Sequence, residues 1–211
     1  MYKVNTKLDV NEFKLNAAGL LPVIAQDYES GEVLFLGQMN AEALEKTAET
    51  GYAHYVKPNG QVYKFGEVQG NTQEVKVAFS DGNGETMLLK VKQKGVANLE
   101  DKTFTMFSKQ VLGAYNEIGG EMFGRLQRIV AEYRKNPVDG SYANFMFTRG
   151  LDKIAKKTGE EAVELVIAAK NTDKQEVIHE SADFLYHMML LLAVKGVSIS
   201  EITAELCKRN R

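Results

Sequence analysis

Two groups of carboxylates in the C-terminal half of this 211-residue chain have the spacing of metal ligands. Glu160, Glu161 and Glu164 fall within little more than one helical turn, so their side chains are neighbours of like charge. Glu180 and Asp183 follow at i, i+3 inside a run that is otherwise largely apolar. An unpaired carboxylate in such a run would destabilise the fold or lose its charge. A bound divalent cation would remove that cost.

Together the two groups offer oxygen ligands of the kind that suit Mg²⁺ or Mn²⁺ rather than zinc. Mg²⁺ commonly binds substrate phosphates, so the chemistry predicted is phosphoryl or pyrophosphoryl hydrolysis by a metal-activated water. Four nearby cations could neutralise the phosphates: Arg149, Lys153, Lys156 and Lys157. The alternative is that the acids form an exposed helix face paired with these lysines, which the apolar setting of Asp183 disfavours. His187, on the same stripe, is more often a hydrogen-bonded core histidine than a catalyst.

Long helices must present these side chains. Apolar periodicity and breakers predict four of them, joined by short loops into a compact bundle: about 123–135, 150–170, 173–196 and from 198 onward. Asp173 with Glu176, and Ser198 with Glu201, resemble capping boxes that open the last two helices.

The N-terminal half has a different texture, with most of the glycines and short apolar segments separated by turn formers. Five strands are predicted: 21–25, 33–36, 53–56, 75–79 and 87–91. One helix interrupts them, over 41–50, with Asn40 as its N-cap and Gly51 at its C-terminal end. Because the texture changes near Gly119 and Gly120, we predict two domains and an α+β fold class: a β-rich domain followed by an all-α helical bundle.

Composition excludes several classes of protein. The single cysteine, Cys207, cannot form an intramolecular disulfide or a zinc site built from several cysteines. A formal net charge of −2 disfavours a nucleic-acid partner. No apolar run approaches the ~18 residues that would span a membrane, and the N-terminus lacks the apolar core of a signal peptide, so a cytoplasmic location is expected.

The helical half resembles a known family. The segment from Gly150 through Glu160-Glu-x-x-Glu164, the Glu180-x-x-Asp183 motif and Gly140-Ser-Tyr are similar to those of phosphoribosyl-ATP pyrophosphatases, over about residues 122–210. That family belongs to the all-α nucleoside triphosphate pyrophosphohydrolases. The resemblance implies Mg²⁺ held by both motifs and cleavage of phosphoribosyl-ATP between its α and β phosphates. It also implies that one of the acids, Glu161 or Glu164, doubles as the catalytic base, although spacing alone does not say which.

The N-terminal half resembles phosphoribosyl-AMP cyclohydrolases, the next enzyme of histidine biosynthesis, over about residues 10–107. The likeness lies in segments such as Leu21-Pro-Val-Ile-Ala-Gln-Asp and Gly51-Tyr-Ala-His-Tyr. That family activates water with zinc held by three cysteines, and an ungapped alignment puts Gly82, Asn98 and Thr105 at their positions. Since these residues are poor zinc ligands, zinc is not expected and the cyclohydrolase activity is doubtful.

The same alignment places oxygen donors at the positions of the family's magnesium aspartates. They are Asp81, Asn83 and Glu85, which would form a vestigial metal loop. An ordinary polar β-turn has the same composition and is the alternative interpretation.

We therefore expect a cyclohydrolase-like domain over 1–112, a linker over 113–121 and a pyrophosphatase domain over 122–211. The expected function is Mg²⁺-dependent hydrolysis of phosphoribosyl-ATP by a homodimer whose partner is a small nucleotide, with no nucleic acid and no membrane. Two alternatives remain: a pyrophosphohydrolase repurposed for another nucleotide, and a regulatory or structural paralogue without catalysis. The true substrate and any residual ligand of the N-terminal domain are not fixed by the sequence.

Overall fold

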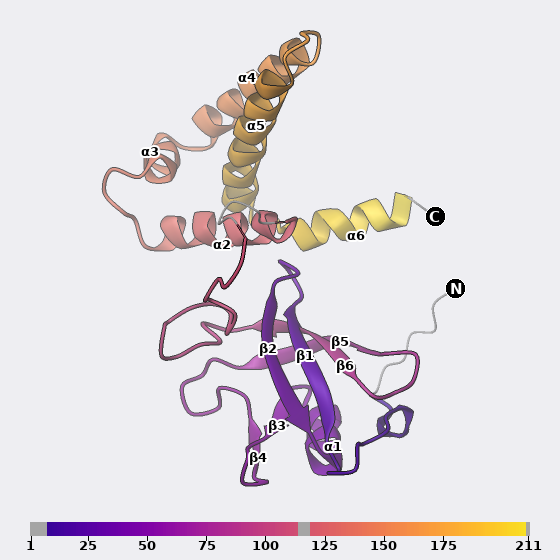
Figure 1. Ribbon diagram of the computed structural model, residues 1–211. Helices are drawn as coiled ribbons and strands as arrows, with labels where there is room; N and C mark the ends of the chain where they lie inside the picture. The colour runs from indigo at the N-terminus through magenta and orange to yellow at the C-terminus, as the bar shows by residue number, and fades with distance from the viewer. Residues whose placement is uncertain (1–7, 114–118, 210–211) are drawn as a thin grey trace. The chain divides into compact units, whose positions relative to one another are not determined.

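The computed structural model describes residues 8–113 and 119–209. The chain divides into two compact units, Met1–Ile118 and Gly119–Arg211. The first is a β-sheet unit with one α-helix and the second is entirely helical, so the predicted α+β class is confirmed (Figure 1). Most of the predicted linker, residues 114–118, lies outside the described residues.

The first unit is built on a four-stranded sheet in the order β2-β1-β6-β5. β1 (Leu21–Asp27) pairs antiparallel with β2 (Val33–Met39) and parallel with β6 (Met87–Gln93), and β5 (Gln73–Ser80) pairs antiparallel with β6. A separate hairpin joins β3 (His54–Val56) to β4 (Val62–Lys64). All five predicted strands are present. The sequence missed β4, because three residues are too few to show an alternating pattern.

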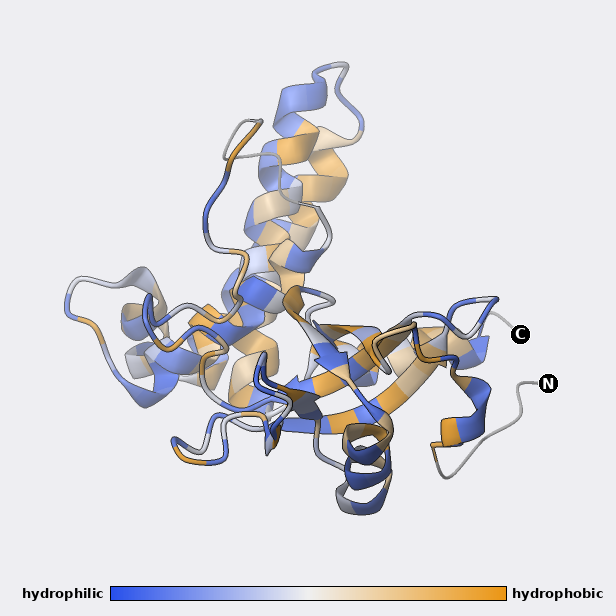
Figure 2. Ribbon diagram, turned by 60° about the horizontal axis from the view of Figure 1, so that its bottom comes forward, coloured by the Kyte–Doolittle hydropathy of each residue, from blue (hydrophilic) through white to orange (hydrophobic). Residues whose placement is uncertain are grey.

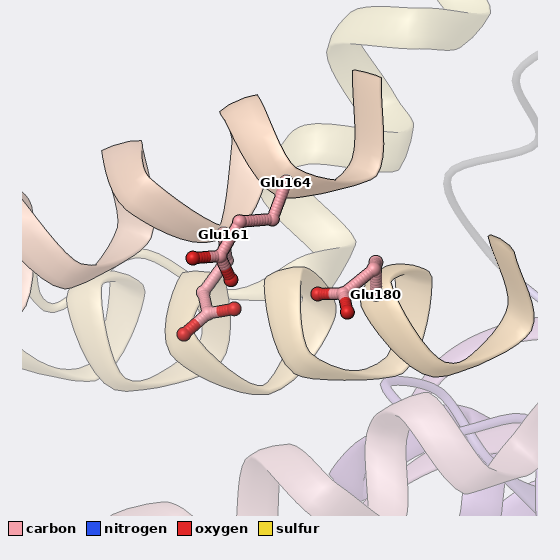
Figure 3. Close-up of side chains that lie close together, drawn as sticks. All are labelled: Glu161, Glu164 and Glu180. Atoms are coloured by element: carbon pink, nitrogen blue, oxygen red, sulfur yellow. The ribbon is translucent and has the colours of Figure 1, made fainter. Parts of the chain in front are cut away.

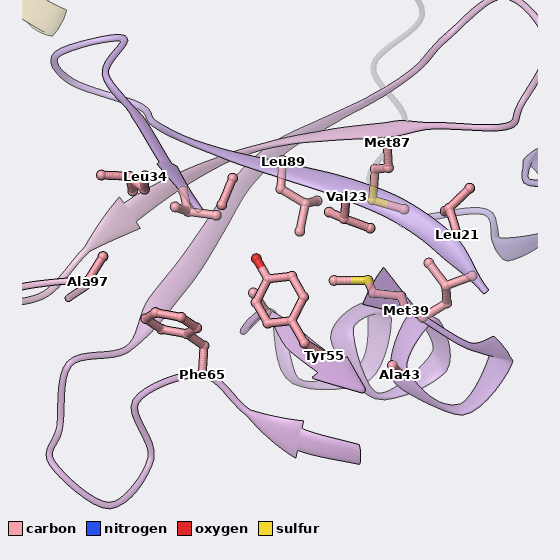
Figure 4. Packing of buried hydrophobic residues seen from close by; sticks show 14 residues of the cluster. Leu21, Val23, Leu34, Met39, Ala43, Tyr55, Phe65, Met87, Leu89 and Ala97 are labelled. Carbon is pink, nitrogen blue, oxygen red and sulfur yellow. The ribbon is translucent and has the colours of Figure 1, made fainter. Parts of the chain in front are cut away.

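One face of the sheet covers the core of this unit (Figure 4). Alternate residues of β1 and β6 are buried there, as the period of two in a strand requires, and Tyr55 from β3 packs among them with no exposed surface. The Tyr55 hydroxyl donates to Gln73, whose amide donates to Gln93, so this buried polar group is satisfied.

The helix α1 (Ala41–Thr50) begins and ends where its caps predict. The Asn40 side chain accepts a hydrogen bond from the Ala43 amide at 2.8 Å, and Gly51 adopts the left-handed conformation at φ 70°. A helix of ten residues is too short to be stable alone, so its burial of Leu44 and Thr47 against the core also holds it.

The second unit contains five helices within the described residues, not the four that were predicted. They are α2 (Glu121–Lys135), α3 (Tyr142–Arg149), α4 (Leu151–Ala168), α5 (Lys174–Lys195) and α6 (Ile199–Arg209). The missed element is α3, which is only eight residues long and rich in aromatic residues of low helix propensity. It is separated from α4 by Gly150 alone, at φ 83°.

α4 and α5 pack along each other as a long pair that extends away from α2 (Figure 1). Their connection is short, and Asp173 caps α5 by accepting from the Gln175 amide, although Glu176 binds Asn171 rather than closing the predicted box. The box at α6 is complete, because Ser198 and Glu201 each accept from the other's amide.

α5 is long and apolar enough, by length and composition, to be a candidate membrane span, which the sequence analysis did not anticipate. The same test is passed by core helices of soluble proteins, and α5 packs against α4 and α2 and carries Glu180 and Asp183. Figure 2 shows apolar and polar residues mixed along both long helices. Several apolar side chains of α4 remain exposed: Leu151, Val163, Val166 and Ile167.

Candidate functional site

Three of the predicted carboxylates meet between α4 and α5 (Figure 3). Glu161 and Glu164 project from one side of α4, and Glu180 projects from α5. One oxygen of each lies within 4.8 Å of one oxygen of the other two. They form the only group of three or more His, Cys, Asp or Glu side chains in residues 8–113 and 119–209 that has the geometry to hold a metal ion.

The three carboxylates differ in their surroundings. Glu161 is buried, with 3% of its surface exposed, whereas Glu164 is exposed and Glu180 is partly buried. The Lys157 ammonium lies 2.6 Å from Glu161, and this hydrogen bond holds the pKa of the Glu161 carboxyl below its ordinary value and raises the pKa of Lys157. The charge of Glu161 raises the pKa of the neighbouring Glu164. Carboxylates this close repel one another, and a cation bound between them would relieve that repulsion.

Glu160 points into a different set of contacts. Its carboxylate lies 3.6 Å from Lys156 and 3.8 Å from Lys157. This is the surface pairing that the alternative interpretation described, and for Glu160 it is what the structure shows. Glu160 does not join the group of three.

Asp183 also lies outside the group, although it is one turn beyond Glu180. Its carboxylate is 45% exposed and lies 3.4 Å from His179. The sequence suggested a carboxylate enclosed by apolar neighbours, but the face of α5 that carries Asp183 is open to solvent in the single chain.

Three of the four predicted phosphate-binding cations lie on α4, before the carboxylates in the chain. Lys157 precedes Glu161 by one turn, and Lys153 precedes it by two turns on the same stripe. Arg149, at the end of α3, stacks its guanidinium over the Phe145 ring at 5.2 Å. Next to this ring, a cavity of about 450 Å³ opens at the start of α3 between residues 137 and 148.

His187 is the core histidine that the cautious interpretation favoured, and it has specific partners. It is 5% exposed, and its Nε2 lies 2.9 Å from the Tyr142 hydroxyl. Its Nδ1 lies 2.8 Å from the Asp183 carbonyl oxygen and 3.7 Å from Glu161. Sequence spacing could not have revealed the Tyr142 contact, because the two residues are 45 positions apart.

In the first unit, the residues aligned with zinc cysteines serve the fold. The Asn98 carbonyl accepts from the amides of Glu100 and Asp101, and its amide donates to the Asp101 carboxylate at 3.0 Å. The Thr105 hydroxyl donates to the Val33 carbonyl at 2.6 Å and accepts from the Phe107 amide. Gly82 offers no side chain. These positions therefore do not fit a zinc ion.

The segment with Asp81, Asn83 and Glu85 is a tight turn between β5 and β6. The Asp81 carboxylate accepts from the amides of Glu85 at 2.7 Å and Thr86 at 3.2 Å, and Gly84 supplies a positive φ of 77°. The contacts are those of a polar β-turn. A turn alone can therefore account for these residue types, as the alternative interpretation has it.

Comparison with protein families assigns both halves. The family described as phosphoribosyl-ATP pyrophosphohydrolase matches residues 123–210, and the family described as phosphoribosyl-AMP cyclohydrolase matches residues 35–105. The carboxylate group lies inside the first match, and the three cysteine-aligned positions lie inside the second.

Curated relatives match nearly the whole length of this chain. The chain is similar to the histidine biosynthesis bifunctional protein HisIE of Caldanaerobacter subterraneus subsp. tengcongensis, with 39% identity over 96% of this chain and 98% of that protein. The HisIE proteins of Pyrococcus furiosus and Bacillus subtilis are 39% and 37% identical, over 92% and 95% of this chain and 92% and 96% of their own lengths.

Proposed function

Because the chain belongs to the family of bifunctional histidine biosynthesis proteins HisIE, we propose that its helical unit hydrolyses phosphoribosyl-ATP with the help of Mg²⁺ or Mn²⁺. In this reaction the oxygen of a water molecule bonds to the α phosphorus. The bond from that phosphorus to the oxygen bridging to the β phosphate breaks, and phosphoribosyl-AMP and pyrophosphate leave. The observation that carries this proposal is the group formed by Glu161, Glu164 and Glu180.

The donor set fits a hard divalent cation. Three carboxylates from two helices supply oxygen ligands only, and Mg²⁺ commonly keeps waters and substrate phosphates in its remaining positions. A bound Mg²⁺ would supply charge neutralisation at the phosphates and acidify a water molecule. We assign Glu161, Glu164 and Glu180 as the core ligands, with Glu160 and Asp183 as flanking acids that reach the ion or its waters.

The residues around the cluster have distinct proposed roles. Glu161 is buried and tied to Lys157, so it serves as a fixed ligand. Glu164 is exposed, which lets water reach it, so it is our choice for the base that takes the proton from the attacking water. The phosphate chain is to be held by Arg149, Lys153, Lys156 and Lys157.

We further propose that the N-terminal unit lacks cyclohydrolase activity. The family's reaction needs three zinc-binding thiolates, and the side chains at two of those positions, Asn98 and Thr105, are hydrogen-bonded to backbone groups of other residues. The third position, Gly82, has no ligand atom. Asp81, Asn83 and Glu85 are then remnants of a metal loop that now closes a turn.

A repurposed pyrophosphohydrolase is the main competitor, since loss of the second activity weakens the link to a single pathway. A non-catalytic paralogue is disfavoured by retention of every motif acid. Other nucleoside triphosphates are therefore the comparison substrates. The proposed molecule is a cytosolic homodimer, since exposed apolar residues on α4 such as Val163 and Val166 would be covered by a second copy.

The test incubates the full-length protein and Mg²⁺ with phosphoribosyl-ATP beside a panel of standard and modified nucleoside triphosphates, and measures pyrophosphate. The proposal expects the highest kcat/KM for phosphoribosyl-ATP. Turnover of another triphosphate without release from phosphoribosyl-ATP would favour the repurposed enzyme. No turnover of any nucleotide would favour the non-catalytic paralogue.

A further inference from the structure

A hydrogen bond between two helices involves a histidine that contacts the carboxylate group. Tyr142, the first residue of α3, and His187, in α5, meet at 2.9 Å between the hydroxyl and Nε2. The imidazole is 5% exposed whereas Tyr142 is 44% exposed, so the contact is buried on the histidine side only. Removing the Tyr142 hydroxyl would be costly on that side, because the buried Nε2 of His187 would lose its hydrogen-bond partner.

Both nitrogens of His187 have a hydrogen-bond partner, and the partner of Nδ1 fixes which nitrogen donates to it. The Asp183 carbonyl, 2.8 Å from Nδ1, can only accept a hydrogen bond, so Nδ1 carries the proton. In the neutral ring Nε2 then accepts from the Tyr142 hydroxyl. Two anchors, one on α5 itself and one on α3, therefore set the plane of the imidazole.

That ring contacts the buried member of the carboxylate group. His187 Nδ1 lies 3.7 Å from Glu161, whose other neighbour is the Lys157 ammonium at 2.6 Å. The Thr158 hydroxyl links the two helices here, because it shares its proton between the backbone carbonyls of Ile154 on α4 and His187 on α5. Glu161 thus lies between the Lys157 ammonium, which binds it, and an oriented imidazole on α5, which packs against it and limits where its carboxylate can lie.

We propose that Tyr142 is a positioning residue for the metal site: its hydroxyl orients His187, and His187 in turn fixes Glu161. The inference rests on the proposed role of Glu161 as a metal ligand and adds a third helix to the site. Groups that support metal ligands in this way commonly change metal affinity by about 10–100-fold when they are lost.

The test uses Tyr142→Phe in the full-length protein, which removes the hydroxyl and keeps the ring among its aromatic neighbours. Tyr186→Phe is the matched control, because Tyr186 packs against both rings, with centroids 6.2 Å from Tyr142 and 5.7 Å from His187. Mn²⁺ affinity is measured without substrate by electron paramagnetic resonance, and kcat is measured against Mg²⁺ concentration.

We expect Tyr142→Phe to raise the Kd for Mn²⁺ by roughly tenfold or more and to regain kcat at excess Mg²⁺. Tyr186→Phe should behave as the wild type. An unchanged Kd in Tyr142→Phe would overturn the inference, as would an equal change in both variants. A wild-type protein that does not bind Mn²⁺ would overturn both this inference and the proposed site.

His187→Gln supplies the second arm. Since Tyr142 acts through His187, the double variant should bind Mn²⁺ no more weakly than His187→Gln alone. Losses that simply add would show that Tyr142 acts by another route. The proposed substrate is judged separately: the expected Mn²⁺ results without pyrophosphate release from phosphoribosyl-ATP would support the positioning role and reject that substrate.

Discussion

At the scale of single residues, burial separates acids that look alike in the sequence. Glu160 and Glu161 are adjacent, yet Glu161 enters the group with Glu164 and Glu180 while Glu160 binds surface lysines. Helical spacing predicted which acids could be neighbours. It could not predict that the Asp183 carboxylate is 45% exposed, because that depends on which face of α5 is covered.

The first prediction concerns the group itself. Glu161→Gln and Glu164→Gln keep the side-chain volume and remove the charge, so each should lower kcat for pyrophosphate release by at least the ~100-fold that marks the upper end for loss of a residue supporting a metal ligand. Asp152→Asn is the control, because this exposed acid lies in the first turn of the same helix.

Activity of Glu161→Gln or Glu164→Gln close to the wild-type value would reject the assignment of these residues as ligands. A similar loss in Asp152→Asn would instead mean that any change of charge on α4 is harmful. Circular dichroism on each variant shows whether the helices remain formed.

At the scale of elements, local signals predicted boundaries well where a cap is made by neighbouring residues. Asn40, Gly51 and the Ser198–Glu201 box lie where the sequence placed them. The short elements β4 and α3 escaped prediction because tertiary contacts, not propensity, hold them. β4 pairs with β3, and α3 buries Ala143 and Met146 in the helical core.

The second prediction tests the cap of α1. Asn40→Ala removes the acceptor for the Ala43 amide and should lower the free energy of unfolding of the first unit by about 1 kcal/mol. Chemical denaturation followed by the fluorescence of its tyrosines measures this. Glu45→Ala, at an exposed position of the same helix, should change it by less than about 0.5 kcal/mol. Equal effects would contradict the capping role.

The third prediction concerns acid and α6. The Ser198 amide, and then its hydroxyl, bind the Glu201 carboxylate and hold its pKa below the ordinary value of about 4.3. Since the folded pKa is depressed, the stabilisation is present above the ordinary value and is lost as the pH falls through the folded pKa.

Nuclear magnetic resonance titration of the Ser198 amide should therefore show a midpoint below that of a free glutamate. Ser198→Ala keeps the backbone donor and removes the hydroxyl, so its midpoint should lie between the two values. A wild-type midpoint at or above the ordinary value would show that the box does not bind the ionised carboxylate in solution.

At the scale of the whole molecule, the families of both halves were recognisable from the sequence, and the two families' reactions need different ligands. The proposed carboxylate chemistry needs only acids at helical spacing, and the chain has them. Zinc chemistry needs three thiolates, while the chain has one cysteine, Cys207, exposed on α6. What the sequence could not supply was the pairing of Tyr142 with His187 or the structural use of Asn98.

The fourth prediction is that a second copy covers the exposed apolar face of α4. Light scattering should give about twice the chain mass of 23.5 kDa. Val166→Glu would bury a charge in that interface and should shift the protein towards the monomer. Val68→Glu, at an exposed position of the first unit, should leave the mass unchanged. A monomeric wild type would contradict the homodimer.

One measurement tests both proposed activities: the full-length protein is incubated with phosphoribosyl-ATP and Mg²⁺, and the products are identified by mass spectrometry. We expect phosphoribosyl-AMP and pyrophosphate in equal amounts, with the purine ring intact and no product when the metal is chelated. Untouched phosphoribosyl-ATP, or product formed equally well without a divalent metal, would contradict the central claim. A ring-opened nucleotide would contradict the loss of the cyclohydrolase.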